Sequence, residues 1–240
     1  MRRPQTGFSL LEMAVTLAIV GILLTGLVMS LSAQQDASRQ AQVRRQLAEA
    51  REALYGFAMA NGRLPCPAAP ALASGAAGAG SEQTPTNAGC TGGTSGVLPW
   101  ATLGLPETDP WGHRITYRVD PVFARTQPQT GGFGCSPATA PAQSAFALCS
   151  PGSHAVLGLG GSVSLASGLP AVLVSHGPNG AGAWSTGGTQ LPAGSADESE
   201  NSDGDATFRA GERRENFDDE LDWVVPTILL QRMVQAGKLP

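Results

Sequence analysis

The segment GFSLLEMAVTLAIVGILLTGLVMSL (Gly7–Leu31) decides the fold of this chain. From Met13 to Ala33 no residue is charged. A helix needs about 20 apolar residues to cross a bilayer, so this stretch predicts a membrane-spanning helix over residues 8–33. Glu12 places one carboxylate near its start. An acidic side chain inside a membrane segment costs about 2.5 to 3.5 kcal/mol on insertion scales, so it normally has a partner and a function.

Positive charge directly flanks the apolar run on its N-terminal side. Arg2 and Arg3 come immediately before it, whereas the charged residues that follow it begin only at Asp36. Short basic segments next to a membrane helix stay on the cytoplasmic side. We therefore expect a cytoplasmic N-terminus and export of everything after Leu31.

The leader, Gly7, Phe8 and a glutamate at the fifth position counted from Phe8 form one fixed pattern. This pattern resembles the class III signal of type IV pilins and type II secretion pseudopilins. The resemblance implies cleavage after Gly7 by a prepilin peptidase and methylation of the new amine of Phe8. In these families the glutamate pairs with the N-terminal amine of a neighbouring subunit in the filament, which would give Glu12 its partner.

The same resemblance divides the chain into segments and implies its partners. Residues 1–7 are expected to be a leader peptide, residues 8–33 a transmembrane and filament-core helix, and residues 34–240 a periplasmic, pilin-like head. Other pilins or pseudopilins and the inner-membrane assembly platform are the implied partners. The expected location is the bacterial inner membrane, with a single pass, from which the subunit is extracted into a pilus or pseudopilus.

Two simpler interpretations of the N-terminus stay open. An ordinary secretory signal has an apolar region of about 7 to 15 residues and a cleavage site between small residues. Ser30 to Ser32 could supply that site, but the apolar run is longer and Glu12 is misplaced in it. A plain single-span anchor predicts the span and its orientation but explains neither Gly7 nor Glu12.

Composition limits the classes of partner. The chain has 240 residues, a formal net charge of -4, 31 glycines and 18 prolines. This glycine and proline content favours long irregular loops within one exported domain of ordinary size. Its only lysine is Lys238. Because phosphate backbones are bound by clustered lysine and arginine, we expect no nucleic-acid partner.

Four cysteines, Cys66, Cys90, Cys135 and Cys149, all follow the apolar run, and none forms a C-x-x-C pair. An even number in an oxidising compartment predicts two disulfides, for which three pairings are possible. We prefer Cys66 with Cys90 and Cys135 with Cys149, because each bond would close a loop rich in glycine, alanine and proline. Free thiols and a metal site are the alternatives.

The helix is predicted to continue beyond the apolar run as an amphipathic segment over residues 34–60. Apolar residues recur there at three- and four-residue spacing. They are Val43, Leu47, Ala50, Leu54, Phe57 and Ala58. Asn61-Gly62 is a typical helix end, since glycine is favoured just past a C-terminus. We expect this segment to pack under the head.

Residues 61–240 predict a loop-rich sheet domain. Residues 68–96 are nearly all small or polar and predict a disulfide-tied loop. Strand candidates are separated by glycine and proline turns at the short spacing of antiparallel connections. They are residues 114–119, 144–149, 154–159, 171–175 and 218–225. Pro226 suits the first turn of a C-terminal helix that ends at Gly237.

The predicted fold class is α+β, with a long N-terminal helix packed on an antiparallel sheet head that carries long disulfide-tied loops. The turn Asp109–Gly112, read DPWG, precedes a strand that contains Tyr117. This order is similar to the start of the sheet in major pseudopilins of type II secretion. A buried tryptophan turn in any small sheet would look similar.

The acidic run between residues 197 and 205 is the best candidate for a metal site. Its donors are Asp197, Glu200, Asn201, Asp203 and Asp205. Hard oxygen atoms of this kind bind Ca²⁺ in sets of about six to eight. The EF-hand pattern fails, because alignment on Gly204 puts Ser199 and Ala210 at its end positions. A solvated charge run is the simpler interpretation, whereas the resemblance favours calcium, since major pseudopilins use acidic loops late in the chain for calcium. No cofactor is otherwise required.

Motifs of hydrolases and of phosphate-binding loops are missing, and His113, His154 and His176 lie far apart in the sequence. We therefore do not expect an enzyme. The predicted function is that of a minor pilin or pseudopilin, a structural subunit of a type IV pilus-like or type II secretion filament. The alternative is a tip-displayed adhesin or substrate receptor on a pilin scaffold. Deletion of residues 68–94 would favour the receptor if adhesion were lost while filaments stayed intact.

Overall fold

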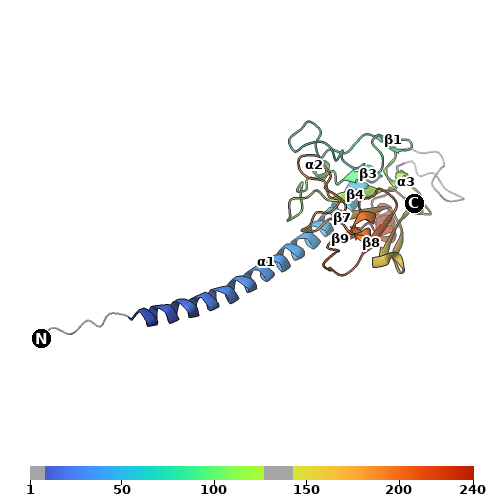
Figure 1. Ribbon diagram of the computed structural model, residues 1–240. Coiled ribbons are helices and arrows are strands. Elements are labelled where there is room, and N and C mark those ends of the chain that lie inside the picture. Colours follow the sequence, from blue (N-terminus) through green and yellow to red (C-terminus); the bar gives the residue numbers. More distant parts are fainter. Residues whose placement is uncertain (1–8, 127–142) are drawn as a thin grey trace. The chain divides into compact units, whose positions relative to one another are not determined.

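The computed structural model describes residues 9–126 and 143–240, and for residues 23–33 it describes the backbone alone (Figure 1). The chain forms two compact units, Met1–Gln42 and Val43–Pro240. One N-terminal helix is followed by short strands and short helices in the second unit. The architecture is therefore α+β, as the sequence predicts.

The N-terminal helix α1 (Leu10–Asn61) is continuous over 52 residues. It ends as its sequence predicts, because Gly62 has a φ of 72° and donates its amide to the Ala58 carbonyl at 2.7 Å. In the part of the chain that the structure describes, no helix is both long and apolar enough to cross a membrane. This finding differs from the helix expected to span a membrane over residues 8–33, whose side chains from 23 to 33 lie outside the described residues.

The C-terminal part of α1 belongs to the second unit and supplies one side of its main core. Its buried residues are Val43, Leu47, Ala50, Leu54, Tyr55 and Ala58. They share that core with Leu229 and Met233 of α5 (Pro226–Gln235) and with inward-facing residues of a sheet. The predicted amphipathic spacing is confirmed, although Phe57 is only partly buried.

The described strands form a four-stranded sheet, a three-stranded sheet and a two-stranded ribbon. The first sheet is antiparallel and has the order β3 (Ser95–Val97), β4 (Thr116–Val119), β7 (Ala171–Ser175), β9 (Glu220–Trp223). The second has the order β6 (Ser164–Leu169), β5 (His154–Gly158), β8 (Thr207–Ala210). The ribbon pairs β1 (Pro85–Thr86) with β2 (Gly89–Cys90).

Strands β5 and β8 run parallel, which corrects the expectation of a purely antiparallel sheet. Parallel neighbours need a connection of about a dozen residues or more. The chain between them is long enough, because it passes through β6, β7 and the short helix α4 (Ala196–Glu200) before it returns. The remaining short helices are η1 (Leu159–Gly161), α2 (Trp100–Leu103) and α3 (Pro121–Ala124).

Strand β7 contributes to both cores of the head, and all five of its residues are buried. Successive side chains of a strand point to opposite faces of the sheet. Ala171 and Leu173 belong to the core formed with α1 and α5. Val172 and Val174 belong to a second core, which also contains Phe208 of β8. The four-stranded sheet therefore lies between a helical layer and the smaller sheet.

The loops next to the sheet are held by Arg114, whose side chain is fully buried. Its guanidinium donates hydrogen bonds to the Glu107 carboxylate, at 2.7 and 3.0 Å, and lies 4.8 Å from the centre of the Trp100 ring. It also donates to three loop carbonyls, those of Pro70, Leu72 and Thr186. One buried arginine thus connects three separate loop segments.

Four of the five strand candidates contain strands, namely β4, β5, β7 and β9, but the candidate at residues 144–149 is wrong. That segment is irregular, although Ala145 and Phe146 are fully buried. The Ala145 amide donates to the carbonyl of Gly62 at 2.8 Å, and the Phe146 ring lies 4.6 Å from that of Phe123. Its apolar run therefore packs at the end of α1, and it pairs with no strand in the part of the chain that the structure describes.

Candidate functional site

The first turn of α1 begins at Ser9. The amide of Glu12 donates to the backbone carbonyl of Ser9 at 3.1 Å and to its Oγ at 3.2 Å. A serine followed three residues later by a glutamate is the sequence of a capping box, which satisfies amides at a helix start. Glu12 is exposed and lies where a carboxylate interacts favourably with the helix dipole. Gly7 and Phe8, the predicted processing residues, lie outside the described residues.

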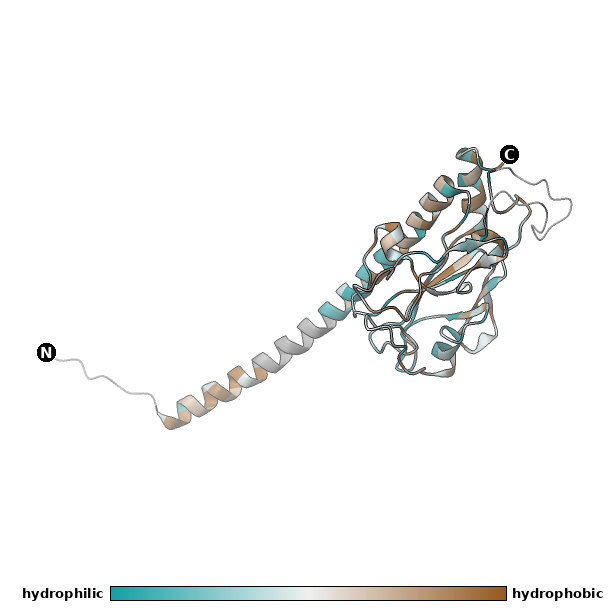
Figure 2. Cartoon of the chain, turned by 90° about the horizontal axis from the view of Figure 1, so that it is seen from above, coloured by the Kyte–Doolittle hydropathy of each residue, from teal (hydrophilic) through white to brown (hydrophobic). Residues whose placement is uncertain are grey.

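Large apolar side chains around Glu12 are exposed on several sides of the helix. They are Leu10, Leu11, Met13, Val15, Leu17, Ile19, Val20 and Ile22. Leu10 is 93% exposed and Ile22 is 74% exposed. Figure 2 shows this beginning of α1 as predominantly hydrophobic. A helix that is apolar on all sides is normally surrounded by other protein or by lipid.

One predicted disulfide is present, because Cys66 and Cys90 are bonded to each other. The bond connects the start of the loop that follows α1 with strand β2. Cys149 is disulfide-bonded as well. Cys135, its predicted partner, lies outside the described residues, so that pairing stays a prediction.

The structure places most carboxylates of the acidic run against arginine or backbone amides. Arg209 lies 2.9 Å from Glu200 and 3.6 Å from Asp197. Asp203 and Asp205 each accept a hydrogen bond from an amide two residues further along, at 2.9 and 2.6 Å. These four residues are therefore used in local structure, and calcium binding by the run stays a prediction.

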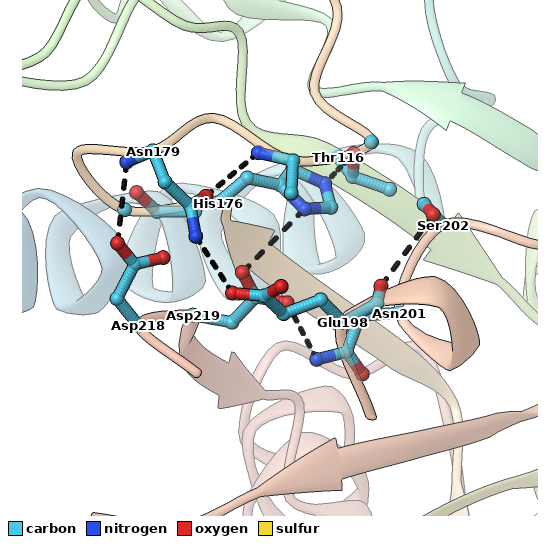
Figure 3. A network of polar contacts seen from close by, with 12 residues as sticks. Thr116, His176, Asn179, Glu198, Asn201, Ser202, Asp218 and Asp219 are labelled. Carbon is cyan, nitrogen blue, oxygen red and sulfur yellow. Dashed lines mark hydrogen bonds and ion pairs between the residues drawn. The ribbon is translucent and has the colours of Figure 1, made fainter. Parts of the chain in front are cut away.

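Asn201 alone among the predicted donors joins a buried polar cluster, which contains Glu198, Asp218, Asp219 and His176 (Figure 3). Its side-chain amide donates to Asp219 Oδ2 at 2.7 Å. The same side chain bonds to the amide and the carbonyl of Arg209, at 2.7 and 3.0 Å. Asn201 thus connects β8 with this cluster.

Strand register brings the cluster together. β7 and β9 are antiparallel and Ser175 pairs with Glu220. The next residues outward, His176 and Asp219, therefore meet at the same end of the sheet, where His176 Nδ1 lies 3.8 Å from Asp219 Oδ1. On the other side of the ring, His176 Nε2 lies 2.8 Å from the hydroxyl of Thr116 in β4.

Two turns supply the other members of the cluster. The Asn179 amide donates to Asp218 Oδ2 at 3.2 Å, and the Asn179 side chain donates to Glu198 Oε1 at 2.8 Å. Glu198 also accepts from the Ser195 amide at 2.8 Å in a capping box at the start of α4. Gly177 has a φ of 57°, and a Cβ there would lie 2.5 Å from the carbonyl oxygen of Asp218. Glycine is thus required where the chain turns past Asp218.

Burial governs protonation in the cluster. It raises the pKa of the Asp219 carboxyl to about 8, and the hydrogen bond from Asn201 opposes this only in part. It also raises the pKa of Asp218. The pKa of His176 is lowered to about 4 by burial and then by the charge of His113. Near pH 7, His176 and Asp219 are therefore both mostly neutral and do not form an ion pair.

The cluster has the spacing of a cation site. One ligand oxygen from each of Glu198, Asp218 and Asp219 lies within 4.8 Å of the other two. Asp218 Oδ1, Asp219 Oδ1 and His176 Nδ1 are buried and have no hydrogen-bond partner among the described residues. Sequence reasoning identified the strand candidate at residues 218–225 and the acidic run, but it missed the cluster. The adjacent pair Asp218 and Asp219 before a strand was the available signal.

Comparison with known families gives one finding, which concerns the N-terminus. Residues 2–28 match the family model described as the prokaryotic N-terminal methylation motif. The matched segment contains Gly7, Phe8 and Glu12. No curated protein and no solved structure matches the chain.

Proposed function

We propose that this chain, whose N-terminus is the prepilin-type cleavage and methylation signal of type IV pilins and pseudopilins, is a minor subunit of such a filament. Prepilin peptidase would cut after Gly7 and the amine of Phe8 would be methylated. The subunit would then join other pilins or pseudopilins through α1, with help from an inner-membrane assembly platform.

The observation that carries this proposal is the match at residues 2–28, and the exposed apolar surface of α1 supports it. Side chains such as Leu10 and Ile22 need a cover of protein or lipid, and neighbouring subunits supply it in a filament. Glu12, exposed in the first turn, would then neutralise the new amine of Phe8 on an adjacent copy. A minor role is favoured over that of a major pilin, because long loops complicate dense lateral packing.

Insertion into the inner membrane before assembly is part of the proposal. The uncharged sequence from Met13 to Ala33 supports it, as do Arg2 and Arg3 on the N-terminal side. The head would then be periplasmic. Extraction of membranes with alkaline carbonate is expected to leave the uncleaved chain in the pellet, and release into the supernatant would contradict this part.

N-terminal mass spectrometry of the protein from wild-type cells tests the processing. The expected result is a chain that begins at N-methylated Phe8, whereas an intact Met1 would refute the proposal. Assembly is tested with Glu12→Ala, which is expected to be cleaved normally and to be lost from sheared filaments. Asp36→Ala removes an exposed acidic side chain from the same helix and serves as the matched control. Normal incorporation of Glu12→Ala would contradict the assembly role.

A further inference from the structure

We propose that Glu198, Asp218 and Asp219 bind one divalent cation, with His176 Nδ1 beside it as a nitrogen donor. The acidic run contributes only Glu198 to this site, because its other carboxylates, those of Asp197, Glu200, Asp203 and Asp205, are used by Arg209 and by backbone amides. It lies at the end of the four-stranded sheet where β7 stops and β9 begins. Its assignment is independent of the proposed filament role.

The spacing of the carboxylates is the first argument. Oxygen ligands of calcium lie about 2.3 to 2.6 Å from the ion, so two oxygens on one ion are at most about 5 Å apart. The three ligand oxygens of the cluster lie within 4.8 Å of one another. They are therefore close enough to one another to be ligands of the same ion.

Uncompensated charge is the second argument. No arginine or lysine among the described residues forms an ion pair with these three carboxylates. Glu198 is 2% exposed and Asp219 is 4% exposed. Buried charges are normally paired or coordinate a metal. The alternative is that the carboxyl groups are protonated. A bound cation would replace those protons with positive charge that all three carboxylates share.

His176 provides an independent third argument. Its side chain is completely buried, and Nδ1 has no hydrogen-bond partner among the residues that the structure describes. Figure 3 shows Nδ1 directed at Asp219, but the separation of 3.8 Å is too long for a hydrogen bond. On the opposite side, Nε2 can donate to the Thr116 hydroxyl at 2.8 Å. A histidine that donates one ring N–H to a neighbour and directs the other nitrogen outward is oriented as metal-ligating histidines generally are.

The surrounding hydrogen bonds hold the donors in place without using all of their oxygens. Asn179 and Asn201 each donate to one carboxylate through their side chains. Asp218 Oδ1 and Asp219 Oδ1 receive no hydrogen bond from the described part of the chain. The mixture of three carboxylates and one imidazole suits Mn²⁺ or Zn²⁺, while Ca²⁺ would use the oxygens alone.

The test measures thermal unfolding and isothermal titration of the purified full-length protein, first treated with a chelator and then exchanged into metal-free buffer. Mn²⁺, Zn²⁺ and Ca²⁺ are added separately at 1 mM. We expect at least one ion to raise the midpoint of unfolding by several degrees and to bind with a stoichiometry near one. If no ion does both, the proposal is wrong.

Variants locate the site. Asp219→Asn keeps the shape of the side chain and is expected to weaken binding of the effective ion at least tenfold, while the metal-free protein stays folded. Glu198→Gln provides a second variant in case Asp219→Asn fails to fold. Asp203→Asn, in the exposed part of the acidic run, is the matched control and should bind as the wild type does. Equal binding by the wild type, Asp219→Asn and Glu198→Gln would overturn the assignment.

The role of His176 is tested by comparing how one variant binds different ions. His176→Gln is expected to weaken Mn²⁺ or Zn²⁺ at least tenfold, while its effect on Ca²⁺ stays below twofold. If the variant leaves transition-metal binding unchanged, the nitrogen ligand is excluded and that part of the proposal fails.

Discussion

The backbone amide of Val225 donates a hydrogen bond to the hydroxyl of Tyr55 at 2.9 Å, which joins α1 to the residue that precedes α5. Burial raises the pKa of Tyr55, so the hydroxyl stays protonated at neutral pH. The Arg232 guanidinium lies 4.6 Å from the centre of the same ring. Helix α5 is thus attached to α1 by a polar contact as well as by the core.

Tyr55→Phe tests that contact. It keeps the ring and removes the hydroxyl, so the Val225 amide loses its partner. We expect a loss of about 1 kcal/mol in the free energy of unfolding, measured by urea denaturation of the purified full-length protein in detergent. Ile228→Val, at an exposed position of α5, should change stability little. An unchanged midpoint for Tyr55→Phe would mean that water replaces the hydroxyl without cost.

Arg114→Leu is expected to be much more harmful than loss of an exposed arginine. Removal of its guanidinium leaves Glu107 and three loop carbonyls without their donor, and breaking a buried ion pair in this way costs about 3 to 5 kcal/mol. Arg44 pairs with Glu220 but its side chain is 65% exposed, so Arg44→Leu should cost only about 0 to 1 kcal/mol. Thermal unfolding followed by circular dichroism compares the two. Similar midpoints would contradict the role given to Arg114.

Replacement of both Cys66 and Cys90 by alanine tests the disulfide. The bonded residues are 24 positions apart. A crosslink across a loop of this length contributes about 3 kcal/mol in the chain-entropy model. We expect the double variant to lose stability by that order in non-reducing buffer and to be cleaved sooner by protease within residues 68–89. Wild-type stability of the double variant would show that the loop is held by its other contacts.

The buried side chain of His154 is expected to make the protein less stable in acid. Burial lowers its pKa from 6.5, while Asp120 and Arg118 act on it in opposite directions. At pH values between the lowered pKa of His154 in the folded protein and 6.5, its value in the unfolded chain, the unfolded chain binds more protons than the folded one. The contribution of His154 to stability is therefore complete above about pH 6.5 and falls as the pH drops. His154→Phe keeps an aromatic ring beside Phe208 and cannot titrate.

The midpoint of thermal unfolding is therefore expected to fall less between pH 7.5 and pH 5 in His154→Phe than in the wild type. His176 is expected to keep its own contribution in both proteins, because its pKa is lowered by burial and by His113 and not by His154. An identical pH dependence of the two proteins would mean that His154 does not contribute.

Local patterns were sufficient to predict the two longest helices, α1 and α5, and four of the nine described strands. The spacing from Val43 to Ala58 predicted the buried face of α1, and Pro226 predicted the start of α5. The strand predicted at residues 144–149 was wrong, because the apolar residues of this segment pack at the end of α1 instead of in a sheet. A run of apolar residues indicates that a segment is buried, but a buried segment need not be a strand.

The buried cluster could not be predicted in this way. His176 and Asp219 are neighbours only because β7 and β9 pair in one particular register, and that register depends on the whole sheet. Glu198 is positioned in the cluster by the capping box at the start of α4. That position depends on the fold of the turn and cannot be read from the acidic residues next to Glu198 in the sequence. The N-terminal signal is different, since Gly7, Phe8 and Glu12 are recognised by their order along the chain.

The position of strand β7 affects how the head unfolds. Its alternate residues complete two cores, and its backbone is bonded to β4 on one side and β9 on the other. Neither the helical layer nor the smaller sheet can separate without exposing one of those cores to water. The two layers are therefore coupled thermodynamically, and amides on both should exchange with solvent in a single cooperative opening.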